Sequence, residues 1–457
     1  MAGIVTRTLG RRSYSALDVL AIPLTEHLPI TRPGAVSHVI PEVEVSTLST
    51  GLVVSSVNNL SPISKVSIFV EGGSRHETYA NRGATHFLRS SSYLNTKGAS
   101  SFRIVRGIGD VGGKLHVSSG REHMIYSVDC LQDKVETLME YLVNVTTAQD
   151  FRIWELATVR ARVRLEKALA FQSPQIGLVE NLHNVAYKNA LQNSIFCPAD
   201  MVDRITPTMI QEFVQNHFTS GRIALVGIGV SHADLKQLGE QFLNVRGGRG
   251  SPIAQAKYRG GEVRQQTSGE YVHAAVVAES APIGTAEAKA FLLLQQVLGM
   301  GPNLRWGHSA GRLWHAVAKE TAQSFAVSSL NLAYSDSGLF GIYTVCAPTA
   351  AIKVIRAALA QVKAVANGNL TEADVARARA LAASRMVMAA ETRVGLLDEL
   401  GSQAMATSSF RPPAHIAADL RNVKIADVVA VAKRFVAGKK SMAASGDLRR
   451  TPCLDEL

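Results

Sequence analysis

An internal repeat constrains the fold more than any other feature of the sequence. The segment Ile125-Tyr-Ser-Val128 recurs as Ile342-Tyr-Thr-Val345, 217 residues later, and Ile176-Gly-Leu-Val-Glu-Asn-Leu182 resembles Val394-Gly-Leu-Leu-Asp-Glu-Leu400 at a spacing of 218. Three positions near the end of each half match at the first spacing: Phe218, Gly221 and Gly229 with Phe435, Gly438 and Gly446. Because one register holds across about 100 residues, the sequence predicts two similar halves.

The order of predicted elements is the same in the two halves. Each half begins with an apolar segment typical of strands, 53–70 or 271–277, and continues through helical stretches. Each closes on a helix and a last strand, 223–230 or 442–445. Strands and helices do not alternate regularly, which argues against a doubly wound sheet. We therefore predict an α+β protein of two homologous domains, each a mostly antiparallel sheet packed with helices.

Composition divides the chain into five predicted parts. Residues 1–14 contain three arginines and no acidic residue, as in a mitochondrial transit peptide. The proline-containing stretch 15–41 reads as an extended arm. An N-terminal domain spans 42–243, a Gly-rich linker 244–262 and a C-terminal domain 263–457. The linker would let the two domains face each other across a chamber.

Charge and cysteine content exclude several classes of function. Only 19% of the residues are charged, so we expect a partner to cover apolar surface, as in a subunit of an assembly. The net charge of +11 is not gathered into Lys/Arg blocks with aromatic residues, so nucleic-acid binding is not expected. The four cysteines form no CxxC pair, so the sequence predicts neither a disulfide framework nor a cysteine zinc site. No apolar run approaches the roughly 18 residues of a membrane-spanning helix, so an integral membrane protein is not expected.

Two short motifs resemble catalytic or cofactor-binding patterns but stand in the wrong context. Gly107-Ile-Gly-Asp-Val-Gly112 matches the dinucleotide-binding glycine pattern, yet a predicted helix precedes it and a predicted strand follows, the reverse of the required order. Gly307-His-Ser-Ala-Gly311 matches the serine-hydrolase elbow without a strand to enter it. We predict a helix-to-strand turn at the first motif and no nucleophile at Ser309.

A third cluster points to metal chemistry. Gly73-Ser-Arg-His-Glu77, Asn81-Arg-Gly83 and His86-Phe-Leu-Arg-Ser90 follow a predicted strand and open a predicted buried helix. This order resembles the mitochondrial processing peptidase and pitrilysin family of zinc metallopeptidases. In that family the helix carries H-x-x-E-H, whose two histidines bind zinc and whose glutamate activates water. A later glutamate completes the zinc site, and the resemblance places Glu166 in a suitable helix.

The motif is degenerate at two of its three functional positions. His86 is kept, but Arg89 stands where the general base belongs and Ser90 where the second imidazole belongs. Arginine has no acceptor atom and keeps its charge, so it can neither take a proton from water nor sit beside a dication without repulsion. We therefore predict no catalytic residue, no metal and no cofactor, with His86 hydrogen-bonded on a packing helix and Glu166 paired with a nearby cation.

Further segments resemble the core-protein branch of this family in respiratory complex III: 95–102, 111–115, 214–220, 334–340 and 440–446. This resemblance implies a bowl of two halves that pairs with core protein 1 in a dimeric complex. It also implies contact with cytochrome b and other complex III subunits, peripheral to the inner membrane on its matrix side. In active relatives an Arg/Tyr pair stabilises the transition state. The resemblance implies that Tyr334 or Tyr343 occupies the position of that tyrosine.

Two other functions remain open at this point. The chain could form half of a matrix processing-peptidase site, or it could be a presequence-binding module. In the family, the Gly-rich region corresponding to 298–311 lies where the non-catalytic processing subunit holds its presequence. Either alternative would make the chain a peptide-handling protein and not a structural subunit.

Overall fold

The computed structural model describes residues 42–59, 61–301 and 311–457. Four expectations from the sequence therefore fall wholly or largely outside the described residues: the transit peptide 1–14, the arm 15–41, the elbow serine Ser309 and the segment 298–311 that would hold a presequence. Residues 42–457 form one compact unit. Among its described residues, no helix has both the length and the hydropathy needed to cross a bilayer.

The first half contains a six-stranded sheet in the order β1-β2-β6-β3-β5-β4. Its neighbours are antiparallel except β2 and β6, which run parallel. Its strands are β1 (Val43–Thr47), β2 (Val53–Val57), β3 (Ile63–Val70), β4 (Lys114–Ser119), β5 (Met124–Leu131) and β6 (Ile223–Ile228).

The second half repeats this topology with five strands in the order β7-β11-β8-β10-β9. Only β7 and β11 are parallel, as β2 and β6 are in the first sheet. The recurring sequence segments lie on β5 and β10, each next to an edge strand, so the α+β prediction and the internal repeat are confirmed. The strands are β7 (Gly261–Gln266), β8 (Val272–Glu279), β9 (Phe325–Ala333), β10 (Gly338–Cys346) and β11 (Lys440–Gly446).

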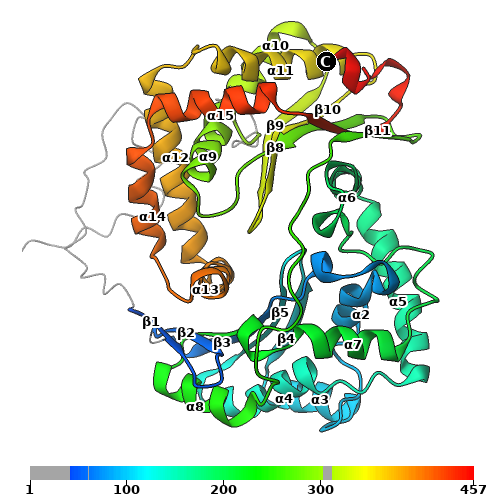
Figure 1. The fold of residues 1–457 in the computed structure, drawn as a ribbon, viewed down its shortest axis with the longest axis vertical. Coiled ribbons are helices and arrows are strands. Elements are labelled where there is room, and N and C mark those ends of the chain that lie inside the picture. The colour runs from blue at the N-terminus through cyan, green and yellow to red at the C-terminus, as the bar shows by residue number, and fades with distance from the viewer. Residues whose placement is uncertain (1–41, 60, 302–310) are drawn as a thin grey trace, which may run out of the picture. The chain divides into compact units, whose positions relative to one another are not determined.

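The helices also follow the repeat (Figure 1). Those of the first half are α2 (Ala84–Ser90), α3 (Ser101–Asp110), α4 (Val135–Thr147), α5 (Ile153–Phe171), α6 (Pro174–Ala186), α7 (Pro207–His217) and α8 (His232–Phe242). Those of the second half are α9 (Ala286–Leu298), α10 (Arg312–Glu320), α11 (Ala351–Ala366), α12 (Glu372–Glu391), α13 (Arg393–Thr407), α14 (Pro413–Asp419) and α15 (Ile425–Ala437). The glycine motif at 107–112 forms the end of α3 and the turn into β4, as predicted.

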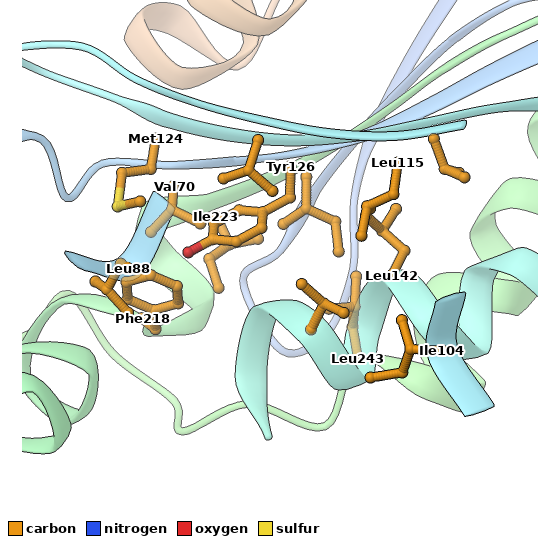
Figure 2. Packing of buried hydrophobic residues seen from close by; sticks show 14 of the residues in the cluster. Val70, Leu88, Ile104, Leu115, Met124, Tyr126, Leu142, Phe218, Ile223 and Leu243 are labelled. Carbon is orange, nitrogen blue, oxygen red and sulfur yellow. The ribbon is translucent and has the colours of Figure 1, made fainter. Parts of the chain in front are cut away.

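Each sheet buries one face against helices of its own half. In the first half, apolar side chains of α2, α3 and α4 pack against the inward residues of β3, β4 and β5, and Figure 2 shows Leu88, Ile104 and Leu142 beneath Tyr126 of β5. Because side chains alternate along a strand, Ile68 enters this core while the next residue, Phe69, points to the opposite face. That opposite face of the sheet therefore needs a further apolar element to pack on it.

The helix that packs on this opposite face comes from the other half of the chain. Helix α13 of the second half packs on β2, β3 and β6 of the first, and Leu400 lies in one cluster with Phe69. Its sequence counterpart α6, from the first half, packs on β7, β8 and β11 of the second, where Leu182 meets Val277. The two halves thus exchange one helix each, and neither sheet is fully covered without the other half.

A buried ionic cluster also joins the halves. The guanidinium of Arg75, 2% exposed, donates to both carboxylate oxygens of Asp336 at 2.6 and 3.2 Å and pairs with Glu122. Asp336 lies on the turn between β9 and β10 and also accepts the backbone N–H of Ala256 at 2.8 Å. Because a buried guanidinium needs anionic partners, this cluster fixes the β9–β10 turn of the second half against the first.

Candidate functional site

The predicted degenerate metal motif lies on α2, a short helix whose start is held by the nearby carboxylate of Glu77. Gly83 adopts φ 94° at the N-cap, a left-handed value that favours glycine. Glu77 accepts hydrogen bonds from the backbone N–H groups of Gly83 (2.7 Å) and Thr85 (2.9 Å). Burial raises the pKa of Glu77 to about 7 although these hydrogen bonds favour its charged form. The start of α2 is therefore held by the segment that directly precedes it.

The structure brings together all four residues that the sequence assigned to the degenerate zinc site. Helix α2 packs on α5, and Oε2 of Glu166 on α5 lies 3.2 Å from Nε2 of His86. The same oxygen accepts hydrogen bonds from Arg89 Nη2 at 3.0 Å and from Ser90 Oγ at 3.2 Å. The other carboxylate oxygen, Oε1, accepts from Arg162 Nε at 2.8 Å. Both oxygens of Glu166 are thus engaged by side-chain donors.

Charge compensation dominates the electrostatics of this cluster. Burial alone would raise the pKa of Glu166, but hydrogen bonds from Arg162, Arg89 and His86 outweigh it and lower the pKa to about 2. Burial, reinforced by the nearby charge of Arg89, lowers the pKa of His86 to about 4. At neutral pH the cluster therefore contains an ionised Glu166, two guanidinium groups and a neutral imidazole.

The backbone also determines which nitrogen of His86 carries the proton. The N–H of Cys197 points at Nδ1 of His86 at 3.1 Å, so Nδ1 must be an acceptor. In a neutral imidazole the proton then sits on Nε2, which donates it to Glu166. A zinc ligand needs a free lone pair on the nitrogen that faces the metal. The nitrogen that faces Glu166 therefore carries a proton in place of that lone pair.

These residues do not fit a zinc ion. Of the groups that converge on Glu166, Arg89 repels a dication and Ser90 is a poor ligand at neutral pH. A catalytic zinc takes three protein ligands, whereas this cluster offers His86 and a Glu166 that is already neutralised. Across the described parts of the chain, no group of three or more His, Cys, Asp or Glu side chains is arranged to hold a metal.

A pocket of about 410 Å³ opens beside the cluster. It lies along β4, the edge strand of the first sheet, and Arg89, Arg162 and Glu166 form part of its wall. These three side chains together carry a net positive charge, because two guanidinium groups stand against one carboxylate. Such a pocket suits neutral or acidic groups better than basic ones.

The equivalent place in the second half carries different chemistry. Helices α9 and α12 pack together there as α2 and α5 do in the first half. Arg385 occupies the α12 position that corresponds to Glu166 on α5, 219 residues earlier, and its Nη1 donates to Oε1 of Gln296 on α9 at 2.8 Å. These two side chains line a pocket of about 250 Å³. Sequence patterns did not predict this counterpart, because neither residue type suggested a site.

Tyr334 and Tyr343 are the two candidates for the tyrosine that acts on the transition state in active relatives. The hydroxyl of each forms a hydrogen bond with a histidine of this chain. The hydroxyl of Tyr334 lies 2.7 Å from Nε2 of His183 on α6, and that of Tyr343 lies 2.8 Å from Nδ1 of His273 on β8.

Two groups of this site were not predicted from the sequence. Arg162 could have been found, since it stands one helical turn before Glu166. The backbone N–H of Cys197 left no sequence signal.

Comparisons with known proteins agree with this geometry. Residues 52–199 match the model of the insulinase family (peptidase family M16), and residues 204–381 match the M16 inactive domain. The domain of the second match is described as inactive.

Named relatives are similar over nearly the whole chain. A mitochondrial cytochrome b-c1 complex subunit 2 from Rattus norvegicus is 52% identical, covering 98% of this chain and 99% of the relative. The Homo sapiens protein of the same name is 51% identical over 91% of this chain and 92% of its own length. A probable mitochondrial-processing peptidase subunit alpha-1 from Arabidopsis thaliana is 27% identical, covering 97% of this chain and 90% of the relative.

Proposed function

The chain belongs to the insulinase family of peptidases, family M16, and from this premise we propose that it is a non-catalytic structural subunit of respiratory complex III. The observation that carries the proposal is the full-length similarity to mammalian cytochrome b-c1 complex subunits 2, at 51–53% identity. In this role the chain pairs with core protein 1, contacts cytochrome b and other subunits of the dimeric complex, and lies peripherally on the matrix side of the inner membrane.

The geometry of the degenerate site supports the absence of peptidase activity. Hydrolysis in this family needs a metal-bound water and a carboxylate to take its proton. Arg89 occupies the carboxylate's position, and it neutralises Glu166 at 3.0 Å. The carboxylate that remains has a pKa lowered to about 2, because the hydrogen bonds from Arg162, Arg89 and His86 outweigh its burial, and is thus a weak base.

A presequence-binding role has two observations in its favour and one against it. The similarity to processing-peptidase alpha subunits favours it, as does a pocket along the edge strand β4. Mitochondrial presequences are rich in arginine and poor in acidic residues. Because Arg89 and Arg162 line the pocket, its wall would repel such a peptide. The structural role is therefore the better supported of the two.

Depletion of the chain in mitochondria tests the proposal. We expect the amount of assembled complex III to fall, while electron transfer per remaining complex stays unchanged, because the chain supplies no redox group. A tagged chain should copurify cytochrome b. Normal assembly of a complex that lacks the chain would contradict the structural role.

A second measurement separates the structural role from a surviving peptidase. The purified chain, alone and with core protein 1, is assayed for bound zinc and for cleavage of a presequence peptide. We expect no zinc in this chain and the same cleavage rate with His86→Ala as with the unchanged protein. Cleavage that disappears with His86→Ala, while the variant keeps its thermal stability, would show that the site is active.

A further inference from the structure

The second half contains a pocket that the proposed function does not use. It is the cavity of about 250 Å³ that Arg385 and Gln296 line, and its walls come from α9, α12, α13 and the start of α14. Helix α12 packs on each of the other three helices (Figure 1). Sites for drug-sized ligands have volumes of roughly 300–1,000 Å³, so this pocket suits a smaller molecule.

Most of the wall is apolar. It includes Leu292 of α9, Met386 and Ala389 of α12 and Pro413 of α14. Leu292 and Met386 are partly buried and pack against the core of the second half. An apolar group inside the cavity would remove more of their surface from water, which is favourable. The walls therefore suit a ligand with an apolar part.

Arg385 supplies a positive charge to the wall. Its Nη1 donates to Oε1 of Gln296 at 2.8 Å and also contacts the sulfur of Met300. Gln296 is 8% exposed, and its Nε2 lies 3.1 Å from the same sulfur, so the amide is fixed and orients the guanidinium. The planar fork of N–H donors on a guanidinium matches the two oxygens of a carboxylate. This part of the wall therefore suits a carboxylate.

Glu399 on α13 supplies a negative charge to the same wall. Its Oε1 accepts a hydrogen bond from Nε2 of Gln403, one turn later, at 2.5 Å. A carboxylate has about four acceptor positions on its two oxygens, so Glu399 can also accept from an ammonium group. Gly395, one turn earlier, lets α13 start close to the end of α12, because a Cβ there would overlap the carbonyl oxygen of Ala389. The two charges thus border one cavity although they come from different helices.

The two opposite charges narrow the kind of ligand. An uncharged molecule would exclude water from Arg385 and Glu399 without replacing the lost hydrogen bonds, which is unfavourable. A ligand with a single charge would attract one of these groups and repel the other. We infer that the pocket binds a free α-amino acid with an apolar side chain, its carboxylate at Arg385 and its ammonium group at Glu399. This ligand site is independent of the proposed function.

The pocket of the first half lacks this arrangement. There Glu166 accepts hydrogen bonds from Arg89 and Arg162, and the three side chains together carry a net positive charge. In the second half, Arg385 and Glu399 contribute one charge of each sign. A zwitterion therefore fits the pocket of the second half better than that of the first.

L-leucine and two analogues test the inference. The full chain is titrated in a calorimeter with L-leucine, with 4-methylpentanoate, which lacks the amino group, and with 3-methylbutylamine, which lacks the carboxylate. Each titration is repeated with Arg385→Gln and with Glu399→Gln. Arg434→Gln is the matched control, because Arg434 lies on α15, outside the pocket, in an exposed pair with Glu287. Thermal unfolding of each variant without ligand checks the fold.

We expect L-leucine to bind the unchanged chain at least about tenfold more tightly than either analogue, because each analogue loses one charge-assisted contact. This comparison needs no variant, so it holds even where a substitution prevents folding. Equal binding of L-leucine and an analogue, or no binding of L-leucine, would overturn the inference and leave the role in complex III untouched.

The variants assign each end of the ligand. Arg385→Gln should weaken L-leucine binding by at least about tenfold but bind 3-methylbutylamine no more weakly than the unchanged chain does. Glu399→Gln should likewise weaken L-leucine binding but not that of 4-methylpentanoate. The control should change L-leucine binding by less than about twofold. Binding of L-leucine that survives both substitutions in the pocket would place the ligand elsewhere, and the inference would be wrong.

Discussion

The two halves share one topology but hold opposite chemistry at the same place. In the first half Glu166 on α5 is an anion surrounded by donors from His86, Arg89 and Ser90. In the second half Arg385 stands at the matching position on α12 and donates to Gln296. The comparison teaches that the packing of these two helices does not depend on one set of polar residues. The predicted zinc-site positions lie in the first half.

The largest expected effect comes from restoring the motif in the first half. Arg89→Glu/Ser90→His would give His86 a second imidazole one turn away and free Glu166 as a third ligand. Zinc binding to protein sites is worth about 10 kcal/mol or more, which exceeds the roughly 1 kcal/mol of the Cys197 N–H hydrogen bond that must be given up. We therefore expect one zinc per chain, measured by elemental analysis after dialysis.

The second half supplies the control for this change. Gln296→His/Arg385→Glu places only two ligands at the equivalent position, so we expect no zinc there. Zinc in both double variants, or in neither, would show that the difference between the halves does not lie in these ligand positions.

The next largest effect concerns the cluster that joins the halves. Arg75→Gln would leave Glu122 and Asp336 without their cation, and removing one partner of a buried ion pair costs about 3–5 kcal/mol. We expect the free energy of unfolding, measured in urea, to fall by that amount. Arg434→Gln breaks an exposed pair with Glu287 and should cost no more than about 1 kcal/mol. Equal losses would mean that Arg75 does not hold the halves together.

The exchanged helices allow a matched pair of substitutions. Leu400→Ala on α13 and Leu182→Ala on α6 remove fully buried side chains at equivalent positions, each against the other half's sheet. Each should lower the free energy of unfolding by about 2–4 kcal/mol, because a cavity remains where the side chain was. A large loss from one substitution and none from the other would show that only one half depends on the exchange.

The smallest expected effect is a pH dependence concentrated in the first half. Burial lowers the pKa of His76 to about 3, of His86 to about 4 and of His183 to about 3. Each folded-state pKa lies below the unfolded value, so the free energy of unfolding that these neutral histidines support is fully present above pH 6.5 and is lost as the pH falls from 6.5 through about 4 for His86 and about 3 for His76 and His183. Glu77, with its pKa raised to about 7 by burial, acts in the opposite direction and loses stability as the pH rises from 4.5 through 7.

His86→Gln isolates the contribution of one of these histidines. The side chain of His86 is fully buried, so the fold holds it neutral. Replacing it should reduce the difference in unfolding free energy between pH 7 and pH 4.5 by at most about 3 kcal/mol. Urea unfolding at the two pH values measures this difference. An unchanged difference would show that His86 is not held neutral by the fold.

Much of the architecture could be predicted from particular residues. The repeat of Ile125–Val128 at Ile342–Val345 gave the two equivalent sheets, because strands at the same position in a duplicated fold face the same neighbours. The interpretation of residues 86–90 as a degenerate zinc motif rests on Arg89 and Ser90, which follow His86 at fixed helical spacing, and it stays a prediction. The exchange of α6 and α13 was not predictable, since an apolar helix face shows that it is buried but not which sheet buries it.

The sequence by itself determined the duplication and the α+β class, because these depend on residue identity and local spacing, and it predicts that Arg89 stands where the family's proton-accepting carboxylate belongs. Only the tertiary structure decided that Arg89 neutralises Glu166, that Cys197 fixes the proton of His86, and that Arg75 joins the halves. Contacts of this kind join residues that lie far apart in the chain. Hydrogen bonds and ion pairs depend on distance in space, which the order of residues does not specify.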